Sequence, residues 1–276
     1  MAATYSAEIL ESPAAHPLEA PAVDPQPVSK KRKRGTKVQI TTKDGVKIPK
    51  SKKRKADEED EIDLELGINT SFAHMNSQLL ADHIAQKTRK YESDLSSIEL
   101  EDKYIPESYI CDTTSWSQKR TLDNLPGFLE KFAGNSTKLW SASKKNGAPH
   151  TIVVTAAGLR AADIARALRK FQTKDASVAK LFAKHIKIQD SVKFLKSTRT
   201  GIAVGTPTRL KDLLEDGALI VDRLERIVVD TSHIDVKKRG ILDMKETHVP
   251  LMTWLGRNEF KERYTAEKDG IQLLFY

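Results

Sequence analysis

The sequence is poor in cysteine and has no long apolar run. Its 276 residues include one cysteine, Cys111, which excludes an internal disulfide framework and a cysteine-rich zinc site. A lone cysteine also suits a reducing compartment. No stretch approaches the roughly 18 consecutive apolar residues of a spanning helix, and residues 1–22 lack the basic and apolar regions of a secretory signal. Neither a membrane protein nor a secreted protein is expected.

Charge, by contrast, is abundant and unevenly distributed. The chain has 46 Lys and Arg against 38 Asp and Glu, a net charge of +8. Residues 30–55 hold 13 basic residues and one acidic residue, and residues 56–65 hold seven acidic residues. With five prolines between positions 13 and 27 and few large apolar side chains, this region cannot bury enough surface to offset the entropy of ordering. Residues 1–65 are therefore predicted to be a disordered charged tail.

Two compact basic clusters lie within this tail. Such clusters bind the acidic groove of an import receptor, and the same charge suits phosphate backbones. The alternative is a solvated linker without a partner. We expect residence in the nucleus, with these nuclear localisation candidates: Lys30, Lys31, Arg32, Lys33, Arg34, Lys52, Lys53, Arg54 and Lys55.

Residues 66–135 are predicted to form a helical extension. The stretch from Asn76 to Glu92 places apolar side chains along one stripe, which is typical of an amphipathic helix that packs on a neighbouring domain or on a partner. Ser96 followed by Glu99 matches a capping box. A further short helical stripe spans residues 125–132 and ends at Gly134.

Residues 136–276 alternate between apolar runs and helical segments. This alternation favours an α/β domain of three layers, in which a mainly parallel sheet is covered by helices on both faces. Such sheets carry their functional residues at the carboxyl ends of the strands. Those ends are expected at Thr155, at Gly205 to Pro207 and at Asp230 to His233, after strands predicted over 151–155, 179–188, 201–205, 224–230 and 270–276.

Taken in order, these strand ends resemble the first RecA-like domain of the DEAD-box RNA helicases. Residues 154–165 resemble the segment after the nucleotide-binding part, and residues 205–209 (G-T-P-T-R) are close to the T-P-G-R element. Residues 230–233 (D-T-S-H) stand where D-E-A-D belongs, and residues 272–275 resemble the strand that leads to S-A-T. The resemblance implies a single RecA-like domain over residues 136–276.

The nucleotide chemistry of that family is not expected here. Residues 141–149, after a possible strand around Trp140, stand where the phosphate loop is expected but contain one glycine and no G-K-[ST]. Thr231 replaces the water-activating carboxylate in the degenerate acidic motif Asp230, Thr231, Ser232 and His233. No catalytic residue, metal or cofactor is therefore assigned. The sequence also ends at Tyr276, where a helicase would continue into the second lobe that its motor needs.

A second resemblance covers residues 76 to 276. Residues 79–86 (L-L-A-D-H-I-A-Q), 94–100 (D-L-S-S-I-E-L) and 121–129 (T-L-D-N-L-P-G-F-L) resemble a nucleolar family of small-subunit ribosome assembly proteins, which are subunits of the 90S pre-ribosomal particle. The resemblance implies a non-catalytic assembly factor of the nucleus and nucleolus whose partners are pre-ribosomal RNA and assembly proteins, with no membrane and no small-molecule substrate. The alternative is an ATP-dependent RNA helicase with divergent motifs.

The degenerate domain is expected to keep an RNA-binding surface. In the helicases that it resembles, the T-P-G-R element contacts the sugar-phosphate backbone, and here Thr206 offers a hydroxyl and Arg209 a bidentate cation. A capped strand-to-helix turn without a ligand is the alternative. The histidines lie on separate predicted elements, so no metal site is expected. The RNA-binding candidates are Arg160, Gly205, Thr206, Arg209, Lys237, Lys238 and Arg239.

Overall fold

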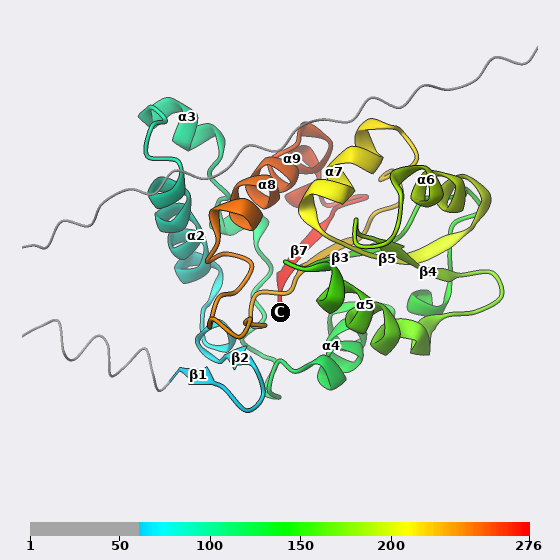
Figure 1. Cartoon of the computed structure of the whole chain (residues 1–276), viewed down its shortest axis with the longest axis horizontal. Helices are drawn as coiled ribbons and strands as arrows, with labels where there is room; N and C mark the ends of the chain where they lie inside the picture. The colour runs from blue at the N-terminus through cyan, green and yellow to red at the C-terminus, as the bar shows by residue number, and fades with distance from the viewer. Residues whose placement is uncertain (1–60) are drawn as a thin grey trace, which may run out of the picture. The chain divides into compact units, whose positions relative to one another are not determined.

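The fold is described from a computed structural model, which describes residues 61–276 (Figure 1). The nuclear localisation candidates and most of the predicted tail lie outside the described residues. The predicted tail does not extend to residue 65, because strand β1 (Ile62–Asp63) pairs antiparallel with β2 (Ile68–Asn69).

A five-stranded parallel sheet forms the centre of the fold. Its order is β4-β5-β3-β6-β7, and every neighbouring pair is parallel. The predicted α/β class with a parallel sheet between helical layers is confirmed. The strand predicted over 179–188 is shorter and begins earlier, because the chain turns after Leu181 and His185 takes a positive φ of 61°. The strands are β3 Thr151–Val154, β4 Ser177–Leu181, β5 Thr200–Gly205, β6 Arg226–Val229 and β7 Gln272–Phe275.

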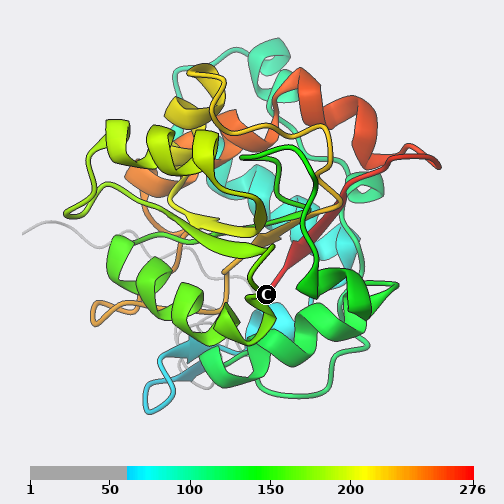
Figure 2. The ribbon, with the colours of Figure 1, turned by 90° about the vertical axis from the view of Figure 1, so that its right-hand side faces the viewer.

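Helices cover both faces of this sheet (Figures 1 and 2). Asn76 caps the predicted amphipathic helix by accepting from the Leu79 N–H, and Ser96 and Glu99 form the predicted capping box. The α-helices are α2 Ser77–Tyr91, α3 Ser97–Asp102, α4 Leu125–Phe132, α5 Gly158–Ala167, α6 Ile188–Ser197, α7 Pro207–Glu215, α8 Lys245–Leu255 and α9 Asn258–Tyr264. The 3₁₀ turns are η1 Ser71–Ala73, η2 Glu107–Tyr109, η3 Leu122–Asn124, η4 Ser136–Trp140 and η5 Leu168–Phe171.

The side chains of the central strands divide the core into two clusters. Ile152 and Val154 of β3 point to the cluster that also contains residues of α2, α6, α7, α8 and α9. Val153, between them, points to the cluster that contains residues of α4 and α5. Because strands buried on both faces need apolar residues at every position, the run Thr151–Val154 is buried throughout. Residues before and after position 135 contribute to both clusters.

Candidate functional site

Four strands end at one edge of the sheet, which we call the carboxyl edge. It is formed by the residues that follow β3, β5, β6 and β7, namely Thr155, Thr206, Asp230 and Tyr276. In parallel α/β sheets the ligand site lies at this edge. The predicted strand ends are therefore brought together as expected.

Asp230 is held in a buried ion pair at the centre of the carboxyl edge. Its residue is 2% exposed, and its carboxylate accepts hydrogen bonds from Thr155 Oγ1 at 2.7 Å and from Arg160 Nε and NH2 at 3.0 Å each. Burial lowers the pKa of Arg160, but the Asp230 charge and its hydrogen bonds outweigh this, so that the pKa is raised. The carboxylate thus has three donors at fixed distances, which is the environment of a structural ion pair.

The rest of the degenerate acidic motif is engaged in backbone pairing. Thr231 Oγ1 donates to the carbonyl oxygen of Tyr276 at 2.8 Å, and the N–H groups of Thr231 and Ser232 donate to the same oxygen. His233 is half-buried, and burial lowers its pKa, so its imidazole is neutral at pH 7. None of these three side chains offers a carboxylate for proton abstraction or magnesium binding.

The segment around β2 covers this motif, which sequence reasoning did not anticipate. Asn69 N donates to Ser232 O at 2.7 Å, and Ile234 N donates to Gly67 O at 3.0 Å. Ile68 is 2% exposed and forms an antiparallel bridge with His233. Gly67 has a φ of 63°, which a side chain rarely adopts. The leucine and isoleucine spacing of residues 62–68 was the available signal, but it is too short to show a partner strand.

The loop expected to bind phosphate lies elsewhere, and the prediction for residues 141–149 is wrong. Gly147 N donates to Thr198 O, immediately before β5 begins, and Ile220 N donates to Gly147 O. Residues 141–149 therefore lie at the amino ends of the strands, on the side of the sheet away from Asp230. Leu139 and Trp140 form part of a 3₁₀ turn instead of a strand of the sheet.

A different segment enters the sheet beside β7. Ile110 bridges to Leu273 in parallel, and Cys111 N donates to Leu273 O at 2.9 Å. The chain then forms a loop at the carboxyl edge over residues 112–121, which contains no glycine, and continues into η3 and α4. A phosphate-binding loop needs glycines so that backbone N–H groups converge on the ligand.

Arg120 fastens this loop to the end of β7. The residue is 2% exposed, and its guanidinium donates to Phe275 O at 2.6 Å and to Thr113 Oγ1 at 2.9 Å. Burial lowers the pKa of Arg120 to about 10, so the group remains charged. Tyr276 Oη donates to Thr121 O at 2.6 Å. The loop is therefore fixed by side chains where a nucleotide-binding protein would leave donors free for phosphate.

The turn that resembles T-P-G-R follows β5. Thr206 precedes α7, and Pro207 occupies its first turn. A Cβ on Gly205 would lie 2.5 Å from Leu181 O, so this position requires glycine. Arg209 is 7% exposed and donates to Ser191 Oγ at 3.2 Å and to Ile186 O at 3.1 Å. The guanidinium thus ties α7 to α6 and to the loop after β4.

The other RNA-binding candidates differ in their freedom. Thr206 is half-buried, whereas Lys237, Lys238 and Arg239 are exposed. Arg239 forms an ion pair with Asp235 at 2.8 Å. Lys238 has a positive φ of 60°, which places it in a tight turn. The structure therefore brings Arg160 and Thr206 to the carboxyl edge, while the three basic residues lie in the loop that follows it.

Two further properties concern the described residues as a whole. Within residues 61–276, no three His, Cys, Asp or Glu side chains are grouped as a metal site would require. The same part of the chain contains no helix whose length and apolar character would let it cross a bilayer.

The sequence and fold can be compared with known proteins. A family model described as "CMS1: U3-containing 90S pre-ribosomal complex subunit" matches residues 22–276. Protein CMS1 of Chaetomium thermophilum is 60% identical over 227 residues, or 82% of this chain and 90% of that protein. Protein cms1 of Schizosaccharomyces pombe is 30% identical over 208 residues, or 75% of this chain and 73% of that protein.

A solved structure is also similar in part. The yeast DEAD-box splicing factor Prp28 aligns with a TM-score of 0.35 and 19% identity over 51% of this chain and 28% of the Prp28 chain. The family match, in contrast, covers almost all of the chain, and the relative at 60% identity matches most of it. The chain therefore belongs to the CMS1 family of U3-containing 90S pre-ribosomal complex subunits.

Proposed function

We propose that this chain is a non-catalytic subunit of the nucleolar 90S pre-ribosome, which binds pre-ribosomal RNA, assembly proteins or both during rRNA processing. The family supports the particle, because its members are described as subunits of that complex. The Asp230 carboxylate supports the absence of catalysis, because Thr155 and Arg160 already use it in a buried ion pair. That ion pair is the observation on which the proposal depends.

Nucleotide binding tests this proposal directly. Full-length protein is titrated with a fluorescent ATP analogue in the presence of Mg²⁺, and hydrolysis is measured with and without RNA. We expect neither saturable micromolar binding nor turnover. Turnover that is lost in Asp230→Asn and retained in the control Asp235→Asn would favour the alternative, an ATP-dependent RNA helicase with divergent motifs.

We infer that the RNA-facing groups are Thr206 and the loop Lys237, Lys238 and Arg239. These side chains are partly or fully exposed. Arg160, Gly205 and Arg209 would then shape this surface from behind, because their side-chain space or hydrogen bonds are used inside the fold. Exposed lysines bind phosphates through charge, with a strong dependence on salt.

Lys237→Glu and Lys238→Glu test the RNA-facing loop. We expect each to weaken binding to a single-stranded pre-rRNA fragment about equally for all sequences and to lower the salt slope by about 1. Fluorescence anisotropy at several salt concentrations measures both quantities, with the exposed Lys90→Glu on α2 as the control. An unchanged slope in both variants would remove this loop from the RNA surface.

The proposed nuclear and nucleolar residence depends on the two basic clusters between residues 30 and 55. Deletion of residues 30–55 is expected to leave a fluorescently tagged chain in the cytoplasm. A deletion variant that still concentrates in the nucleolus would contradict import through these clusters.

A further inference from the structure

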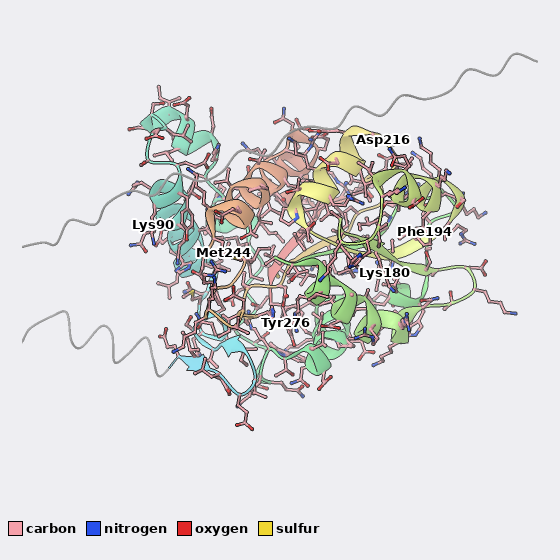
Figure 3. All side chains as sticks on the ribbon, in the orientation of Figure 1. Lys90, Lys180, Phe194, Asp216, Met244 and Tyr276 are labelled. Atoms are coloured by element: carbon pink, nitrogen blue, oxygen red, sulfur yellow. The ribbon has the colours of Figure 1, made fainter. Side chains whose placement is uncertain are left out.

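Strand β4 forms one edge of the sheet, far from the carboxyl-edge ion pair in the order of strands. It pairs with β5 on one side, and within residues 61–276 no strand pairs with its other side. An edge strand presents a row of backbone N–H and C=O groups that can pair with another extended chain. Figure 3 shows Lys180 of β4 and Phe194 of α6 at this end of the sheet, away from Tyr276.

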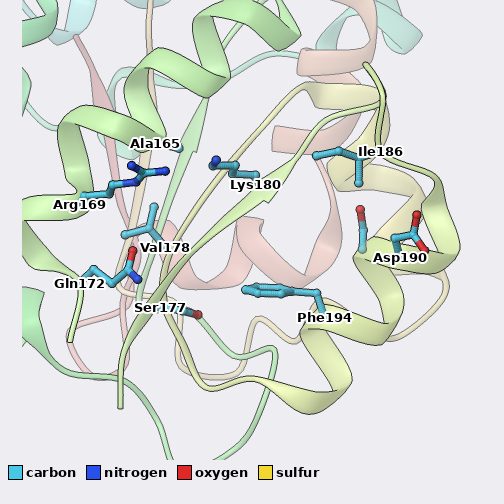
Figure 4. Close-up of a pocket in the computed structure, with 10 residues that line it drawn as sticks. Ala165, Arg169, Gln172, Ser177, Val178, Lys180, Ile186, Asp190 and Phe194 are labelled. Carbon is cyan, nitrogen blue, oxygen red and sulfur yellow. The ribbon is translucent and has the colours of Figure 1, made fainter. Parts of the chain in front are cut away.

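A groove runs along this edge, and we call it the β4 groove. It encloses about 760 Å³, and its apolar wall consists of Ala165, Val178, Ile186 and Phe194. The Phe194 residue is 38% exposed, which is unusual for so large an apolar side chain. Figure 4 shows its ring extending from α6 toward β4. Because α5 and α6 flank the strand, side chains of an added strand would meet apolar surface beside the sheet.

The surroundings of the β4 groove are strongly basic. Residues 168–197 contain eight basic and two acidic residues, and all eight basic residues are exposed. Arg169 and Lys180 line the groove itself, and neither forms an ion pair within residues 61–276. Figure 4 shows the Arg169 side chain reaching from the end of α5 toward Lys180. The eight basic residues are Arg169, Lys170, Lys174, Lys180, Lys184, Lys187, Lys193 and Lys196.

We propose that the outer edge of β4 binds an extended acidic segment of a partner protein as a sixth strand of the sheet, with apolar side chains of that segment entering the β4 groove beside Phe194. Acidic side chains complement Arg169, Lys180 and the surrounding lysines. The backbone of the segment supplies the donors and acceptors that β4 leaves unpaired. The inference deepens the proposed function, on which it rests for the particle in which the partner is found.

The same features favour a polypeptide over RNA. RNA would neutralise the basic residues, but its backbone does not carry donors and acceptors at the spacing of a β-strand. Recognition of single-stranded RNA uses successive aromatic platforms, whereas the groove exposes one aromatic ring, Phe194. An apolar wall, a free strand edge and unpaired cations together match an extended chain of alternating apolar and acidic residues.

Site-specific crosslinking tests the occupant. Tagged full-length protein with benzoylphenylalanine in place of Phe194 is irradiated in the assemblies with which it is purified, and the products are sequenced by mass spectrometry. We expect a crosslink to an acidic segment of another protein. A product that contains RNA, residues 1–60 of the same chain or a segment without acidic residues would overturn the proposal, as would the absence of any product. U3 RNA measured in the same eluate tests the proposed function separately.

Charge reversal and hydrogen exchange test the mode of binding. Arg169→Glu with Lys180→Glu is expected to lower the crosslink yield at position 194 at least tenfold, whereas Lys237→Glu with Lys238→Glu is the matched control with an unchanged yield. Thermal unfolding of each variant establishes that it is folded. Strand addition also slows amide exchange over residues 177–181 in the assembly relative to the free chain. Unchanged exchange there would exclude pairing with β4.

Discussion

The carboxyl edge and the β4 edge of the same sheet treat their polar groups in opposite ways. At the carboxyl edge, Asp230 and Arg120 are 2% exposed, and side chains and carbonyl groups of this chain already bind them. At the β4 edge, Lys180 is exposed without an ion pair in the described chain, and the strand has an unpaired side. The first edge has the position of a ligand site but uses its groups for stability, whereas the second has groups free for a partner.

The largest effect that would test this contrast is expected at Asp230. Asp230→Ala leaves the Arg160 guanidinium, whose side chain is 11% exposed, without its partner. Loss of one member of a buried pair costs about 3 to 5 kcal/mol of unfolding free energy. Urea unfolding measures this change, and Asp235→Ala in the exposed pair with Arg239 is the control, for which little change is expected. A small loss in Asp230→Ala would show that the carboxyl edge is not a structural ion-pair site.

Buried histidines give the next effect, through pH. His248 lies against Lys87 and Asp243, its Nε2 is 2.9 Å from Thr88 Oγ1, and burial lowers its pKa to about 4. Below pH 6.5 the unfolded chain takes up a proton that folded His248 does not bind until about pH 4, so stability falls as the pH decreases through this window. The loss from His248 is about 2 kcal/mol between pH 7.5 and pH 5.

Urea unfolding at these two pH values checks the expectation. His248→Asn removes the titrating group and is expected to show a smaller difference between pH 7.5 and pH 5 than the unaltered chain. His150, whose pKa is also lowered to about 4 by burial, retains its own contribution in that variant. Equal pH dependence in the two proteins would mean that His248 is protonated in the folded state.

Arg209 connects the two edges and gives a smaller effect. Its guanidinium extends from the turn after β5 to Ser191 of α6 and to the carbonyl of Ile186, and both residues line the β4 groove. Arg209→Lys keeps the charge but loses the forked geometry, at a cost of about 1 to 2 kcal/mol. We expect a lower crosslink yield at Phe194 with an unchanged RNA salt slope. A changed slope would instead place Arg209 on RNA.

The sequence predicted the regular elements well because their signals are local. Runs of apolar residues within 151–155 and 201–205 identified β3 and β5, and the Asn76 cap set the start of α2. The alternation of strands and helices then determined the parallel class and placed Asp230 at the carboxyl edge. These predictions needed only neighbouring residues.

The missed features depend on residues distant in sequence. Ile110 and Cys111 contact Leu273 through a single bridge, too short for a periodic pattern, and so the loop over 112–121 was not placed beside Asp230. The bonds from Arg120 to Phe275 and from Asn69 to Ser232 likewise join residues more than 150 positions apart. Sequence therefore located the carboxyl edge but did not show that the chain's own side chains occupy it.

The smallest effect on stability is expected at the β4 edge. Lys180 is exposed and forms no hydrogen bond or ion pair with another side chain of the described chain, so Lys180→Glu removes no contact within the fold. Surface changes of this kind remain within about 0.5 kcal/mol. We therefore expect urea unfolding to be unaltered, whereas the crosslink yield at position 194 falls because an acidic partner now meets a carboxylate. Destabilisation of the isolated protein by Lys180→Glu would mean that this edge serves the fold as the carboxyl edge does, and the contrast between the two edges would be lost.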